Sequence, residues 1–152
     1  MVNYSPQTES LLREAQVPKS VSSASAQNGT SLDTAKKYAR ALFVFAVDNA
    51  VGQSSTLWVQ ESDNDSDWTN ITGKVVTHDV ANDGKLASIE VNLETDGNLA
   101  SHGGHVGRYI RCTLTPSDLD ATVFTVVCML WPKGGARPVT KQVAALHVAA
   151  GN

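Results

Sequence analysis

The sequence contains few charged residues, no long apolar run and no strong net charge of either sign. Charged residues make up 18% of the 152 positions, below the roughly 25% of an average soluble domain. A formal net charge of −3 gives the chain no electrostatic attraction to nucleic acid or to an anionic membrane surface. No stretch reaches the roughly 20 apolar residues of a membrane-spanning helix. The first residues lack a basic start followed by an apolar stretch, so we expect no secretion signal.

Cysteine is also scarce, since the chain has two, Cys112 and Cys128. Each lies within an apolar stretch, which favours buried, reduced thiols that pack as small hydrophobic side chains. If the two stretches pair as a hairpin through the turn at 117–120, Cys112 faces a residue near Phe124 rather than Cys128. A disulfide needs Cα atoms about 4.4–6.8 Å apart, so we expect none here.

Sequence motifs of catalysis are missing. The chain has no GxSxG nucleophile turn, no HExxH zinc motif and no phosphate-binding loop of the Walker type. Ser and His residues occur, but nothing in their spacing places them together. We therefore predict that the protein is not an enzyme and has no catalytic residue and no cofactor.

Two patterns match metal sites only in part. The run Asp63–Asp67 alternates acidic residues like the start of an EF-hand calcium loop. The sixth and twelfth positions of such a loop must be Gly and Glu, and here they are Trp68 and Lys74. The segment His102–His105 offers two imidazoles, and folding could add His78, but structural zinc normally takes four ligands. We therefore predict a solvated hairpin tip and a glycine-rich loop, and no metal site.

Short apolar stretches separated by turn signals recur along the middle of the chain. The turn signals include Asp63–Asp67 and Asn82-Asp83-Gly84, which favour tight reversals. The expected strands are 41–47, 57–62, 68–71, 74–80, 85–93, 108–115 and 121–131. This pattern predicts an all-β protein, a two-sheet antiparallel β-sandwich of jelly-roll-like form with an extended N-terminal arm and a short C-terminal tail. A small closed barrel is the alternative.

Two of the expected strands, 41–47 and 121–131, are apolar without alternation. Strands of this kind are typical of positions buried on both faces. We therefore expect Phe45, Val126 and Leu130 to be almost fully buried.

The first 30 residues are polar and rich in Ser and Ala, with Leu11, Leu12 and Val17 as isolated apolar positions. Such a segment cannot bury enough apolar surface to offset its own ordering entropy. It is either a disordered tail or an arm that becomes ordered against a partner, where residues 8–16 could form a short helix capped by Thr8. The expected organisation is an arm over 1–30, a β-sandwich domain over 31–139 and a tail over 140–152.

Several motifs, taken in order, resemble a group of small tailed-bacteriophage virion proteins. These are β-sandwich proteins with a VQESDD-type hairpin, an RYIR strand, a long apolar strand and a short tail that contains RPV. The matching residues are Val59–Asp63 with Trp68–Ile71, Arg108–Arg111, Val126–Pro132 and Arg137–Val139. The resemblance covers roughly residues 40–139 and leaves out the first 30. It implies a structural protein of the virion and no catalytic residues.

The resemblance implies a capsid cement, or decoration, protein that stabilises the phage head by binding the major capsid protein. It would lie on the capsid exterior, assemble in the host cytoplasm and form a homo-oligomer, a dimer or a trimer. One alternative is a tail or head–tail connector component. Another is a carbohydrate-binding β-sandwich, for which Trp58, Trp68 and Tyr109 could supply the aromatic platform. Neither nucleic acid nor a membrane is an expected partner.

The candidate partner-binding residues fall in two groups. The apolar positions of the arm are Leu11, Leu12 and Val17, which a partner could hold. The second group is Arg108, Tyr109 and Arg111, because arginines beside an aromatic ring can bind carboxylates or stack. A charged solvent-facing or interface surface is the simpler interpretation of this second group.

Overall fold

The computed structural model of the protein describes residues 11–21, 25–35, 37–49, 52–98, 103–117 and 122–133. Within these ranges the chain forms strands and one short 3-10 helix, η1, and no helix that could cross a lipid bilayer. The elements are β1 (Leu11–Val21), β2 (Gln27–Asn28), β3 (Leu32–Asp33), β4 (Tyr38–Asp48), β5 (Ser54–Ser62), β6 (Thr69–Asp79), η1 (Val80–Asn82), β7 (Leu86–Asn92), β8 (Tyr109–Pro116) and β9 (Thr122–Pro132).

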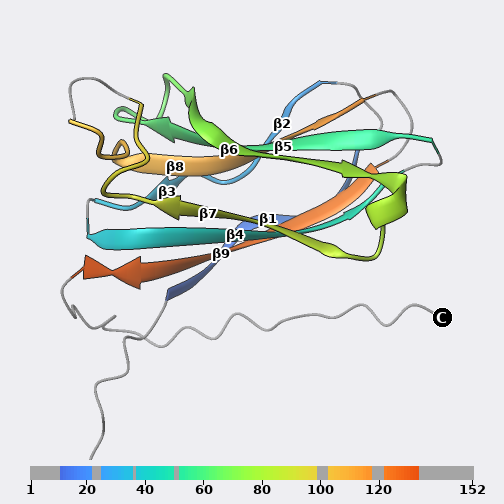
Figure 1. Ribbon diagram of the computed structural model, residues 1–152, viewed down its shortest axis with the longest axis horizontal. Coiled ribbons are helices and arrows are strands. Elements are labelled where there is room, and N and C mark those ends of the chain that lie inside the picture. Colours follow the sequence, from blue (N-terminus) through green and yellow to red (C-terminus); the bar gives the residue numbers. More distant parts are fainter. Residues whose placement is uncertain are drawn as a thin grey trace, which may run out of the picture.

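The strands form two antiparallel sheets that pack face to face (Figure 1). One sheet has the order β1-β9-β4-β7, and the other has the order β2-β8-β5-β6, with β3 also paired to β8. This confirms the predicted all-β sandwich, and the described strands do not close into the alternative barrel.

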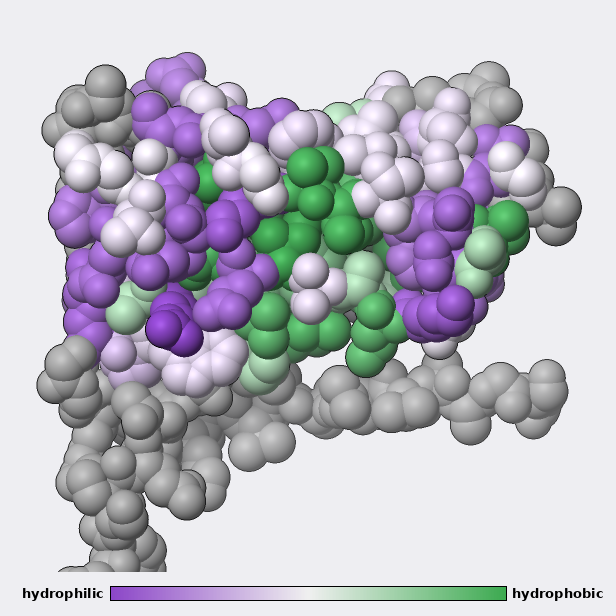
Figure 2. All heavy atoms as spheres, in the orientation of Figure 1, coloured by the Kyte–Doolittle hydropathy of each residue, from purple (hydrophilic) through white to green (hydrophobic). Residues whose placement is uncertain are grey.

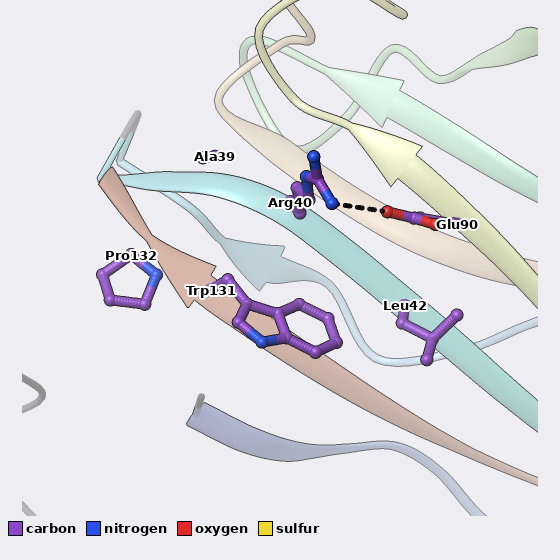
Figure 3. A pocket seen from close by; sticks show the side chains of 6 residues that line it. All are labelled: Ala39, Arg40, Leu42, Glu90, Trp131 and Pro132. Carbon is purple, nitrogen blue, oxygen red and sulfur yellow. Dashed lines mark hydrogen bonds and ion pairs between the residues drawn. The ribbon is translucent and has the colours of Figure 1, made fainter. Parts of the chain in front are cut away.

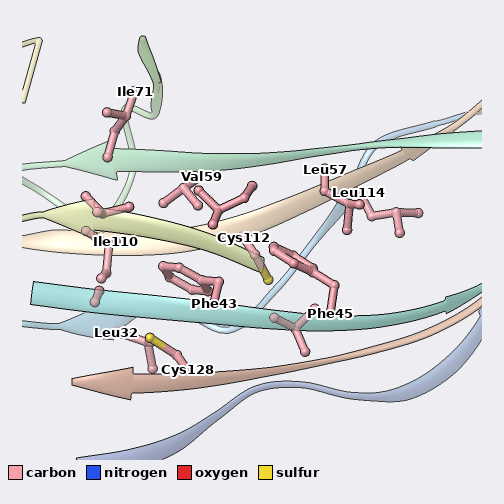
Figure 4. Close-up of a cluster of buried hydrophobic side chains, with 14 of the residues drawn as sticks. Leu32, Phe43, Phe45, Leu57, Val59, Ile71, Ile110, Cys112, Leu114 and Cys128 are labelled. Atoms are coloured by element: carbon pink, nitrogen blue, oxygen red, sulfur yellow. The ribbon is translucent and has the colours of Figure 1, made fainter. Parts of the chain in front are cut away.

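The core lies between the sheets and is built by alternation along each strand. In β4 every second residue from Ala41 to Val47 is buried, while the residues between them are half-buried on the outer face. Figure 4 shows Phe43 and Phe45 pointing from β4 toward the opposite sheet, with ring centroids 6.4 Å apart. The predicted burial of Phe45, Val126 and Leu130 is confirmed. The predicted burial of both faces of β4 is wrong, because only its inner face is covered by the second sheet.

Consecutive strands β8 and β9 do not form the hairpin assumed from the sequence. β8 pairs with β5, and β9 pairs with β4 and β1, so the connection between them crosses from one sheet to the other. Cys112 and Cys128 therefore enter the core from opposite sheets (Figure 4) as buried, free thiols. Burial raises the pKa of Cys112 to about 12 and raises that of Cys128 as well, so both thiols stay protonated and unreactive at neutral pH.

The segment expected to hold two strands separated by Gly73 is one strand, β6. Its pairing with β5 steps from Trp58↔Val75 to Gln60↔Asn70, so residues 71–74 lie opposite Val59 alone. Gly73 sits in this bulge with φ of +75°, a backbone conformation that glycine adopts without strain. Glycine here marks a bulge inside a strand, rather than the end of one.

The N-terminal segment contains strands where none was expected. Residues Leu11–Val21 form β1 and pair with β9, from Leu11↔Leu130 to Val21↔Thr122. Residues 11–16 therefore belong to a strand rather than to the short helix that 8–16 could form against a partner, because their backbone bonds to the edge of β9 instead of to itself. β2 adds a second pairing, to β8. The division into arm, domain and tail stays a prediction, and Thr8 and the tail lie outside the described residues.

A buried carboxylate ties β5 to the loop that leads from β7 to β8. Glu61 is fully buried, and its Oε1 accepts the Asn98 N–H at 2.6 Å while its Oε2 accepts the Gly107 N–H at 2.8 Å. Gly107 lies so close to β5 that a Cβ there would be 2.7 Å from the Ser62 carbonyl oxygen. The missing side chain at Gly107 therefore lets the loop approach the carboxylate.

Candidate interaction surfaces

Arg108, a predicted partner-binding residue, is engaged within the chain. Its Nε and Nη2 donate to the two carboxylate oxygens of Asp33 at 3.1 and 2.7 Å, a bidentate pair that joins the start of β8 to β3. The hydrogen bonds from Arg108 hold the pKa of Asp33 below its ordinary value. The guanidinium also lies 5.0 Å from the centre of the half-buried Tyr109 ring.

Replacing Asp33 with Asn should lower stability at neutral pH and leave it unchanged in strong acid. The pKa of Asp33 is lower in the folded chain than in the unfolded one, so the ion pair stabilises the fold above the unfolded pKa of about 4. This contribution disappears as the pH falls through the folded pKa. Free energies of unfolding for both chains between pH 7 and strong acid test it, and a difference that stays constant with pH contradicts it.

Arg111 is engaged as well. Its guanidinium lies 4.1 Å from the centre of the Trp68 ring, and its Nε donates to Gln60 Oε1 at 2.9 Å. This stacking holds the residue that follows the acidic hairpin tip against β8. One face of the Trp68 ring is thus occupied, which leaves less of an aromatic platform for a sugar ring.

The acidic tip between β5 and β6 is the exposed turn that the sequence predicts. Asn64 organises it, since its Oδ1 accepts hydrogen bonds from the N–H groups of Ser66 and Asp67 and its Nδ2 donates to Asp67 Oδ2.

In the described part of the chain, no group of three or more His, Cys, Asp or Glu side chains lies close enough together to hold a metal ion. His78, which could have joined a zinc site, lies in β6 opposite Ser55, with its Nε2 3.7 Å from Asp83 Oδ1. His102 is outside the described residues.

The outer faces of the two sheets differ in chemistry. On the outer face of β5 and β8, Gln60 Oε1 accepts hydrogen bonds from both Arg111 and Thr113, so this part of the face is polar, while Trp58 and Val75 form an apolar pair beside it. On the outer face of the other sheet, β4 and β9 set Leu42 directly opposite Met129 and Val44 opposite Val127. We call this surface the β4–β9 face. Its apolar residues are Leu42, Val44, Ala46, Leu86, Val123, Val127, Met129 and Trp131, and the polar Ser88 and Thr125 lie among them.

The β4–β9 face reaches the edge of its sheet. Leu86 of β7 pairs with Ala46 and is 72% exposed, and Val123 near the start of β9 is 45% exposed. Figure 2 shows a neighbouring side of the molecule, the edge where β6 and β7 run, with hydrophobic residues gathered in the middle between hydrophilic ends. Sequence reasoning missed this surface because an apolar run does not reveal whether its second face is covered.

A pocket of about 490 Å³ lies at one end of the β4–β9 face (Figure 3). The indole of Trp131 and the side chain of Leu42 line it, and Arg40 Nη1 lies 3.5 Å from Glu90 Oε1 at its rim. Both charged side chains are more than half exposed. The pocket thus combines an apolar wall with a charged rim of both signs.

The predicted apolar positions of the arm lie in β1. Leu11 is opposite Leu130 and Leu12 is opposite Met129 in the register with β9, and Val17 falls where that register shifts. The structure therefore separates the two predicted groups, because Leu11, Leu12 and Val17 belong to one sheet and Arg108, Tyr109 and Arg111 to the other.

No family model and no curated protein matches the chain. Among solved structures, the chain is similar to the PBSX exported protein XepA, with a TM-score of 0.58 and 16% identity over 89% of this chain. This chain spans 42% of the XepA chain. It is also similar to a structure described as Bacillus endospore appendages that form disulfide-linked pili, with a TM-score of 0.45, 13% identity and coverage of 87% and 96% of the two chains. The likeness to XepA shows that the two proteins share the fold.

Proposed function

We propose that this chain is a structural protein of a tailed-phage virion, a capsid decoration protein that binds the major capsid protein through its β4–β9 face. The observation that carries the proposal is the apolar outer face of β4 and β9. The core of a β-sandwich needs only the two inner sheet faces, and here these faces already form it. The apolar side chains on the outer face of β4 and β9 are therefore additional to the core. An additional apolar sheet face on a small domain is typical of a protein interface.

The contrast between the two outer faces supports one docking direction. The β4–β9 face lies against the capsid protein, because burying its aliphatic side chains contributes about 25 cal/mol of binding free energy for each Å² removed from water. The polar face of β5 and β8, with the acidic tip, faces solvent. The pocket beside Trp131 receives one anchoring side chain of the capsid protein.

Two further observations agree with this role. The order of motifs resembles small virion proteins, and the fold is shared with XepA, which is named as an exported protein. The arginines that the sequence suggested for binding are held by Asp33 and Trp68, so the proposal places the main contact on the other sheet. A tail or connector role uses the same apolar face, and the copy number per virion distinguishes it, because cement covers the whole shell.

Replacing Val44 with Lys should weaken binding to purified capsids at least roughly tenfold, equal to about 1.4 kcal/mol. Val44 lies in the middle of the β4–β9 face, opposite Val127, so the new charge would be desolvated on docking. Co-sedimentation of the protein with capsids that lack it measures the affinity.

The matched control is Thr77→Lys, which adds the same charge on the exposed outer face of β6 in the other sheet. It should bind capsids like the unchanged protein. Melting curves of both variants show that each is folded. Equal binding by the two variants removes the β4–β9 face from the proposal, and equal loss by both indicates a general charge effect.

A further inference from the structure

The strand β1 occupies the edge of its sheet, and its described pairing is with β9 alone. That pairing is irregular, since the register shifts between Glu14 and Gln16 and again between Gln16 and Lys19. Pro18 lies in the second shift and has no N–H to donate. By contrast, β4 and β9 pair without interruption from Arg40 to Asp48. β1 is thus a separable element attached along one irregular ladder.

The edge of β9 needs a partner strand. From Thr122 to Trp131 the strand has no charged residue, and an uncharged apolar edge is a template for pairing with other chains. β1 carries Arg13, Glu14 and Lys19, which are residue types that protect an outer edge from further pairing. The sheet is therefore protected only when an 11-residue strand of this type lies on β9.

The connection from β1 to β2 is short. β1 ends at Val21 in one sheet and β2 begins at Gln27 in the other, so five residues, 22–26, join the sheets. Five extended residues reach at most about 18 Å, and packed sheets are about 10 Å apart. A link of this length lets β1 reach β9 of its own chain, as observed, and short hinges of this kind also favour exchange of the attached element between copies.

We propose that β1 of one copy pairs with β9 of a neighbouring copy of this chain in the assembled protein. The exchange replaces the β1–β9 pairing with the same pairing in another copy, so no contact is lost. It leaves every other described strand pairing unchanged. The partner is a second copy, and the site on it is the β9 edge with the register from Leu11↔Leu130 to Val21↔Thr122. This surface is distinct from the β4–β9 face that we propose for the capsid protein.

Cysteine crosslinking tests the exchange without capsids. One chain carries Leu12→Cys and a second, with a different tag, carries Met129→Cys, because these positions are directly paired. The two are unfolded together, refolded at rising protein concentration and mildly oxidised. We expect a disulfide between the two differently tagged chains, in a fraction that increases with concentration. Cys112 and Cys128 stay out of the reaction because they are buried.

The control pairs Leu12→Cys with Leu86→Cys, which is 72% exposed on the opposite edge of the sheet. A second test pair, Ser20→Cys with Val123→Cys, is used if the first pair does not fold. Inter-chain disulfides only at the paired positions support the exchange. The proposal is overturned if none forms at any concentration while a single chain that carries both Leu12→Cys and Met129→Cys forms the disulfide within itself, or if the control crosslinks equally. Capsid binding by the Val44 variant is measured separately, so either proposal can fail alone.

Discussion

Replacing Phe45 with Ala should lower the free energy of unfolding by about 3–5 kcal/mol. The side chain is fully buried in the middle of β4 and stacks on Phe43. Its neighbours belong to regular strands of both sheets, which cannot collapse easily into the space that the ring leaves. The loss therefore includes both the transfer of the ring from water and the cavity. Urea unfolding measures it, as a lower midpoint at an unchanged slope.

Leu86→Ala is the matched control, because it also truncates a large hydrophobic side chain in the same sheet. Leu86 is 72% exposed, so its change in free energy should stay within about 0.5 kcal/mol. A loss below about 1 kcal/mol for Phe45→Ala would show that β4 is not the centre of the core.

Most strands of the sandwich were predictable because they are short apolar stretches separated by turn signals. The strands from β4 to β9 fall within or beside an expected stretch, whereas β3, which supplies Leu32 to the core, does not; the turns at 63–67 and 82–84 follow from their Asn, Asp and Gly content. The sequence could not tell which strands pair. β9 lies beside β4, more than 70 residues earlier in the chain, while its neighbour in sequence, β8, lies in the other sheet.

β1 was missed for a related reason. Its residues alternate poorly and include three charges and a proline, so hydrophobicity gave no strand signal. What fixes it in the structure is the backbone ladder to β9, and a local sequence does not encode the presence of an open edge elsewhere. Tertiary pairing of this kind overrides local propensity.

The candidate surfaces show the same limit. Arg108 and Arg111 are visible in the sequence, but their partners Asp33 and Trp68 come from other strands and loops. The β4–β9 face was visible only as two apolar runs. The structure shows that the second sheet covers one face of those runs and leaves the other face half-buried.

Replacing Glu61 with Gln should lower the free energy of unfolding by about 2–3 kcal/mol, although the side chain keeps its shape. Its two carboxylate oxygens accept the N–H groups of Asn98 and Gly107, and the site is fully buried. A Gln side chain keeps one acceptor and turns an amide donor toward the other N–H. A buried donor left without an acceptor costs about 1–3 kcal/mol, and the opposed donors push the loop away from β5.

The effect should be local before it is global. Amide exchange at Asn98 and Gly107 should become faster in the Glu61→Gln chain, while the amides of β4 and β9 keep their relative protection. Glu90→Gln is the control, because Glu90 lies on the surface with 60% of its side chain exposed, and its change in stability should stay within about 0.5 kcal/mol. If Glu61→Gln is as mild as Glu90→Gln, the carboxylate does not hold the loop. The approach of Gly107 to β5 must then rest on packing alone.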